Sequence, residues 1–153
     1  MNKYMNICVE EAIRGVLSNE GGPFGSVVVK NGEIVGVGHN SVIINNDPTA
    51  HGEMMAIRDA CKNLETFDLT GCELYTSAEP CIMCLGGIMW SNIKKVYYAC
   101  SVADTDDIGF RDGFMYDWLK DRNKETLDME QIDRENGMRA FKVWVDKLDK
   151  EQY

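Results

Sequence analysis

Two strand-like segments joined by a single dipeptide most constrain what this chain can fold into. Residues 24–30 read FGSVVVK, residues 33–40 read EIVGVGHN, and only Asn31-Gly32 separates them. Asparagine and glycine both accept the positive φ values of a two-residue type I′ turn, whose twist suits antiparallel strands. We therefore predict a β-hairpin over residues 24–40.

Helical and strand patterns alternate around this hairpin. Hydrophobic periodicity and turn residues predict, in order, a helix spanning Val9 to Leu17 that ends at Gly21-Gly22-Pro23, the two hairpin strands, a helix in 50–64 with Thr49 as N-cap, a strand in 72–78, a helix in 79–90, a strand in 94–100, a polar loop in 104–113, and helices in 114–121 and 138–148. Such an order favours a mixed sheet covered on both faces, which is an α/β fold in three layers.

The length and composition of the chain fit one globular domain, residues 1–153. A chain of 153 residues with 44% hydrophobic side chains can bury a core of its own, and no repeat or Pro-rich spacer divides it. We find no export signal and no run of eighteen apolar residues, so we expect a cytoplasmic protein with no membrane partner. Its six cysteines should then stay reduced, which favours metal binding or catalysis for closely spaced thiols.

The charge of the chain disfavours a polynucleotide partner. Sixteen basic against twenty-five acidic side chains give a net charge of -9, which repels a phosphate backbone.

Three residues have the spacing of a zinc site. Cys81 and Cys84 are three apart at a predicted helix start, so both sulfurs can bind one ion, and His51 can add a nitrogen. Three protein ligands leave a fourth tetrahedral position for water or hydroxide, which is typical of catalytic rather than structural zinc. We therefore expect one Zn²⁺ per subunit.

Glu53 is two residues from His51 and suits a proton carrier better than a fourth ligand. Together, His51-Gly52-Glu53 and Pro80-Cys81-Ile82-Met83-Cys84 form the H-x-E and P-C-x-x-C signature of zinc-dependent base deaminases. Two other interpretations stay open. One is a structural zinc with Cys72 or Cys100 as a fourth ligand, in a non-catalytic interaction module; the other is a redox-active cysteine pair. For His39 we expect a structural role.

Beyond these motifs, the chain resembles the bacterial guanine deaminase branch of the cytidine deaminase superfamily. The resemblance lies in GGPFGSVVV, GHNSV, NDPTAHGE, TSAEPCIMCLGGIMW and DIGFRDGFMYDWL, and it is strongest from Gly22 to Trp118. It implies a central mixed sheet of about five strands and hydrolysis of guanine to xanthine and ammonia. Guanosine, cytosine or an aminotriazine are alternative substrates. An enzyme that deaminates adenosine in transfer RNA is a less favoured alternative, because the net negative charge of the chain repels a polynucleotide.

The same resemblance implies roles for residues outside the zinc motif. It implies that Phe24 stacks on a purine base, Asn40 hydrogen-bonds it, Trp90 walls the pocket and Asp112 recognises guanine and handles protons. Read from the residues alone, Phe24 and Trp90 could equally be core aromatics, Asn40 could close a turn, and Asp112 could face solvent.

The resemblance also implies a homodimer in which C-terminal segments, about residues 137–153, are exchanged between subunits. Tyr153 would then cap the partner's pocket, although chain ends are usually frayed. Arg111 replaces an acidic residue of the family beside Asp112, and it could pair with Asp112 or reach a substrate carbonyl.

Overall fold

The computed structural model describes residues 2–110 and 112–151, and the chain divides into two compact units, Met1–Asp112 and Gly113–Tyr153. Arg111 and Tyr153, with the roles expected of them, lie outside the described residues.

The first unit is built on a mixed four-stranded sheet in the order β2-β1-β3-β4. Its strands are β1 (Gly25–Lys30), β2 (Glu33–His39), β3 (Cys72–Ala78) and β4 (Lys95–Cys100). Strand β1 is antiparallel to β2 and to β3, whereas β3 and β4 are parallel. The predicted hairpin is confirmed, because Asn31 and Gly32 have φ values of 51° and 83°, both positive as a type I′ turn requires.

The expected count of about five strands is wrong for the residues that the structure describes, which contain four. After β4 the chain turns helical: the Ser101 side chain accepts the N–H of Asp104, and the Asp104 carboxylate accepts the N–H of Ser101. This capping box starts α5 (Val102–Asp107), where we had predicted a loop. A second short helix, α2 (Val42–Asn45), was not predicted.

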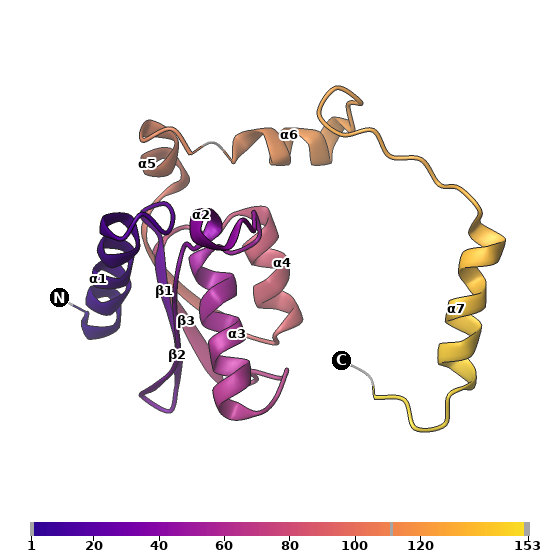
Figure 1. The fold of residues 1–153 in the computed structure, drawn as a ribbon, viewed down its shortest axis with the longest axis horizontal. Helices are drawn as coiled ribbons and strands as arrows, with labels where there is room; N and C mark the ends of the chain where they lie inside the picture. The colour runs from indigo at the N-terminus through magenta and orange to yellow at the C-terminus, as the bar shows by residue number, and fades with distance from the viewer. Residues whose placement is uncertain (1, 111, 152–153) are drawn as a thin grey trace. The chain divides into compact units, whose positions relative to one another are not determined.

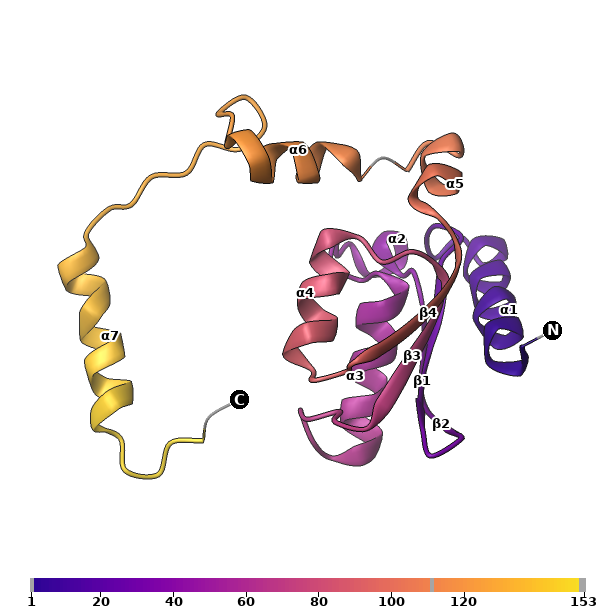
Figure 2. The ribbon, with the colours of Figure 1, turned by 180° about the vertical axis from the view of Figure 1, so that it is seen from behind.

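Helices cover both faces of the sheet, as predicted. Helix α1 (Lys3–Leu17) lies on one face, and α3 (Gly52–Leu64) and α4 (Ile82–Trp90) lie on the other (Figure 1, and from behind Figure 2). Alternate strand residues separate the two cores: Val28 and Leu74 are buried in the cluster beneath α3 and α4, whereas Val27 and Tyr75 are buried in the cluster beneath α1.

Helix α3 is seated directly on the edge strand β2. A Cβ atom added to Gly36 or Gly38 would lie 2.4 Å from main-chain atoms of Ala56, so only glycine permits this approach. From α3, the Asp59 carboxylate accepts the N–H of Val37 at 2.9 Å, and the Asn63 amide donates to the carbonyl of Val35 at 3.0 Å. Two main-chain groups of the edge are therefore bonded to α3 side chains.

The second unit contains α6 (Gly113–Asp121) and α7 (Arg134–Asp146). No residue from 113 to 151 is buried, and apolar side chains on both helices are exposed, among them Phe114, Leu119, Phe141 and Val145. In the described part of the chain, none of the helices is both long and apolar enough to cross a membrane.

Candidate functional site

Two helix starts bring the predicted metal ligands together. His51 is the N-cap of α3 and Cys81 is the N-cap of α4, and both have extended backbones whose side chains make no capping hydrogen bond. The predicted N-cap Thr49 is wrong, because its N–H and hydroxyl both donate to Oδ1 of Asp47 instead. The imidazole and the thiol are thus held where two positive helix ends favour thiolate ligands.

The distances in this cluster fit a tetrahedral zinc ion. The Nδ1 atom of His51 lies 3.6 Å from the sulfur of Cys81 and 3.6 Å from that of Cys84, and the three ligand atoms all lie within 4.8 Å of one another. Tetrahedral zinc with bonds of about 2.3 Å to sulfur and about 2.0 Å to nitrogen would separate a sulfur and a nitrogen by about 3.5 Å, close to the distances found. Of the described residues, no fourth side chain belongs to the cluster.

The protonation of the two thiols also suits a cation. Considering the protein groups alone, a hydrogen bond from Cys84 lowers the pKa of Cys81 to about 4, and the same contact raises the pKa of Cys84. The hydrogen bond to Cys81 raises the pKa of His51. One proton is therefore held between two sulfurs, and a cation bound by both would displace it.

Glu53, in the first turn of α3, is buried beside this cluster. Its Oε2 lies 3.5 Å from the sulfur of Cys84, and burial raises the pKa of its carboxyl group. A carboxyl group whose pKa is raised holds a proton more readily than a free carboxylate, which suits a group that must both accept and donate protons as a general acid and base.

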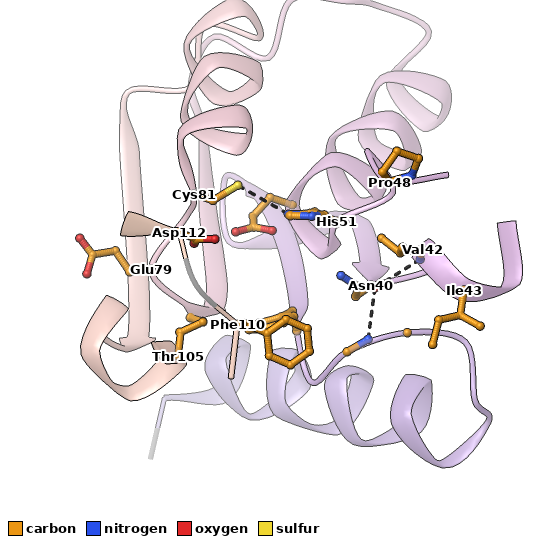
Figure 3. Close-up of a pocket in the computed structure, with 15 residues that line it drawn as sticks. Asn40, Val42, Ile43, Pro48, His51, Glu79, Cys81, Thr105, Phe110 and Asp112 are labelled. Carbon is orange, nitrogen blue, oxygen red and sulfur yellow. Dashed lines mark hydrogen bonds between the residues drawn. The ribbon is translucent and has the colours of Figure 1, made fainter. Parts of the chain in front are cut away.

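A cavity of about 310 Å³ opens over the cluster, at the small end of the range of ligand pockets. Its lining includes His51, Glu53 and Cys81 together with Phe24, Asn40 and Asp112, and Figure 3 shows how the labelled residues surround it. Most of the predicted site residues therefore meet in one cavity within the first unit.

The walls of the cavity combine aromatic rings with one amide. The ring of Phe24 meets that of Phe110 edge to face, with centroids 4.9 Å apart and an interplanar angle of 86°. Asn40 accepts the N–H groups of Gly22 and Val42 on Oδ1, each at 3.2 Å, so its amide nitrogen is left to face the cavity (Figure 3). Asn40 thus both closes the turn and offers a donor.

Asp112 lines the cavity and is half-buried, and burial raises the pKa of its carboxyl group. Trp90 is elsewhere: it is 69% exposed at the end of α4 and does not line the cavity, so we assign it no role there. Sequence reasoning gave no role to Phe110, although it belongs to the DIGF segment that carries the resemblance. It also missed Glu79, which directly precedes the P-C-x-x-C motif, and Thr105; both line the cavity.

The three-layer fold and this site define a class of protein, the zinc-dependent deaminases of nucleobase type. Comparisons with known proteins agree. The model of the cytidine and deoxycytidylate deaminase zinc-binding region matches residues 1–100. A guanine deaminase of Bacillus subtilis is 42% identical over 98% of this chain and 97% of its own length, and the crystal structure of guanine deaminase from Bacillus subtilis superposes with a TM-score of 0.93 over 100% of this chain and 99% of that one.

A tRNA-specific adenosine deaminase of Aquifex aeolicus is also similar, at 46% identity, but over only 63% of each chain. The chain therefore belongs to the zinc-binding family of cytidine and deoxycytidylate deaminases, and its cofactor is zinc.

Proposed function

We propose that this protein hydrolyses guanine to xanthine and ammonia. One observation carries the proposal: a buried glutamate and a cluster suited to zinc share a small cavity with groups that can bind a purine edge. The similarity to a guanine deaminase over nearly the whole chain supports the same substrate. The match to the adenosine deaminase of Aquifex aeolicus covers only 63% of this chain, so it supports the substrate less than the nearly full-length match to guanine deaminase does.

We assign zinc binding to His51, Cys81 and Cys84. Bound there, zinc would polarise water and lower its pKa towards about 7, which supplies a nucleophile at neutral pH. The alternative of a closed structural site needs a fourth protein ligand. Within the described residues, neither Cys72 nor Cys100 joins the cluster, which favours the catalytic assignment.

Glu53 is the proton carrier in this proposal. It takes a proton from the attacking water and delivers it to the ring nitrogen beside C2 of guanine. It then takes the proton that remains on the added hydroxyl group and passes it to the amino group, so that the C–N bond breaks and ammonia leaves. Its position 3.5 Å from Cys84 places the carboxyl group beside the metal ligands, and its burial shields the transfer from bulk solvent.

The remaining cavity residues hold and recognise the base. Phe24 and Phe110 offer apolar surface for a planar ring, and the Asn40 amide can donate to a ring nitrogen or carbonyl. An ionised Asp112 can accept from the amino or ring N–H groups of guanine, whereas adenine presents a different pattern of donors and acceptors. Guanosine, cytosine and aminotriazines remain the alternative substrates for this site.

Ammonia release from guanine, with xanthine measured by absorbance, tests the proposal. We expect the zinc-loaded protein to be active and Glu53→Gln to lose about 10²–10⁴-fold in kcat while it keeps its zinc. The matched control is Glu65→Gln at the other end of the same helix, which should behave like the native protein. A native protein inactive on guanine and on the alternative bases would refute the enzyme assignment, and an active Glu53→Gln would refute the role of Glu53.

We further propose a homodimer that exchanges C-terminal segments, about residues 137–153. The support is that no residue from 113 to 151 is buried, although α7 exposes large apolar side chains such as Phe141 and Val145. Such a helix gains stability by packing on another surface. Light scattering of the native chain and of a chain shortened before α7 measures this, and a native monomer would contradict it. The cytoplasmic location and the capping role of Tyr153 stay predictions.

A further inference from the structure

His39 is a buried histidine outside the metal cluster, at the end of β2 and directly before Asn40. Its Nε2 lies 2.5 Å from a carboxylate oxygen of Glu20. Its Nδ1 lies 3.2 Å from a carboxylate oxygen of Glu11 and 3.1 Å from the guanidinium of Arg14. Because an ionised carboxylate only accepts hydrogen bonds, Nε2 donates to Glu20 whichever role Nδ1 takes.

Glu20 connects this histidine to the chain segments around it. Its carbonyl accepts the N–H groups of Ile43 and Ile44, in the first turn of α2, at 3.0 and 3.1 Å. Its own N–H donates to the carbonyl of Gly15 in α1 at 2.9 Å. The side chain of Glu20 is thus bonded to β2, while its main chain is bonded to both α1 and α2.

The residues that follow Glu20 form one wall of the cavity. Gly21, Gly22 and Phe24 line it, and they are bonded to Asn40: the N–H of Gly22 donates to the Asn40 side chain, and the N–H of Asn40 donates to the carbonyl of Phe24 at 2.8 Å. Packing here is tight, since a Cβ atom on Gly21 would lie 2.2 Å from the carbonyl oxygen of Asn40. A displacement of Glu20 would therefore displace the wall and the Asn40 amide together.

We propose that His39 is a positioning residue which, through Glu20, holds residues 20–24 and the Asn40 amide where they contact the substrate base. The expected effect on KM rests on the proposed function, whereas the restraint of residues 20–24 rests on geometry alone. The structural role predicted for His39 would then be to fix the position of residues 20–24 through Glu20. His51 and Cys81 are the N-caps of α3 and α4, and Glu53 lies in α3, so loss of the His39 contact should weaken base binding and spare the chemical step.

Two substitutions of His39 separate the contributions of its ring nitrogens. Glutamine places an amide N–H near the position of Nε2 and can still donate to Glu20, whereas the shorter asparagine reaches only the position of Nδ1. Since a hydrogen bond to a charged acceptor is lost, we expect His39→Asn to raise KM for guanine about tenfold with kcat changed less than about twofold. His39→Gln should restore the native KM. If His39 only stabilised the fold, its substitution would lower the apparent kcat through loss of folded protein, and KM would not rise separately.

Hydrogen exchange of the zinc-loaded proteins gives a second measurement that needs no activity. Peptides covering residues 18–25 and 40–46 should exchange faster in His39→Asn than in the native protein, and at the native rate in His39→Gln. If the native protein does not act on guanine, the proposed function fails, and this exchange pattern still decides the positioning role.

Equal exchange in all three proteins would overturn the inference, as would an unchanged KM in an active His39→Asn protein or a glutamine variant no better than asparagine. Should His39→Asn fail to fold, Glu20→Ala removes the same contact from the partly exposed partner, and the same increases in KM and in loop exchange are expected.

Discussion

Gly38 provides the most direct test of how the active-site helix is held. A Cβ atom at this position in β2 would lie 2.4 Å from the main-chain nitrogen of Ala56, 2.7 Å from the carbonyl oxygen of Gly52 and 2.7 Å from Cβ of Met55, all in α3. Non-bonded carbon atoms prefer separations of about 3.5–4.0 Å, so Gly38→Ala requires α3 to move by about 1 Å. Main-chain atoms of a helix cannot rotate away as a side chain can.

The expected cost follows from this displacement. Overpacking of a core costs about 1–3 kcal/mol, and we expect Gly38→Ala to lose about 3 kcal/mol of unfolding free energy because the contacts are to backbone. Since His51 and Glu53 lie at the start of the same helix, a shift of about 1 Å should also lower kcat/KM about a hundredfold.

Urea unfolding and steady-state kinetics measure both effects. Gly86→Ala in α4 is the matched control, because its added Cβ would meet no atom within 4 Å, and alanine should stabilise the helix by about 0.5–1 kcal/mol. If Gly38→Ala had the stability and activity of the native protein, the close packing of α3 main-chain atoms on Gly38 of β2 would be refuted.

Two further predictions concern the metal and the pH. Removal of zinc with a chelator should abolish activity and lower the melting temperature, since a ligand at about a thousand times its Kd stabilises by about 4 kcal/mol; unchanged melting after verified metal loss would contradict the assigned site. Burial raises the pKa of the Cys8 thiol from 9.0 to about 12, so its contribution to stability is fully present below about pH 9 and is lost as the pH rises through about 12. Urea unfolding between pH 8 and pH 11 should therefore show a steeper loss of stability for the native protein than for Cys8→Ala, and parallel curves would contradict this.

Local sequence signals predicted the parts of the fold that local chemistry decides. The Asn31-Gly32 turn and the strand at 72–78 are formed as expected, because turn geometry and short apolar runs bounded by turn residues act over a few residues. The capping box of Ser101 and Asp104 was also a local signal, but its polar residues were interpreted as a loop. The strand count failed because it came from the resemblance and not from any β-branched run after Cys100.

Within the site, spacing predicted the meeting of His51, Cys81 and Cys84, since helix starts fix the direction of the side chains that precede and begin them. Phe110 and Glu79 also line the cavity, each just after an element, and both belong to segments that carry the resemblance; their residue types alone gave no reason to place them there. Trp90, which the resemblance placed in the pocket wall, is exposed at the end of α4 and does not line this cavity, so its role stays a prediction.

The side chains that α3 extends to β2 have a consequence for solution behaviour. An edge strand with unbonded amide and carbonyl groups is a template for amyloid-like growth, and Asp59 and Asn63 occupy two such groups on β2. The helix that shields this edge has His51 as its N-cap, so we expect protein stripped of its metal to aggregate on storage more readily than the zinc-loaded protein.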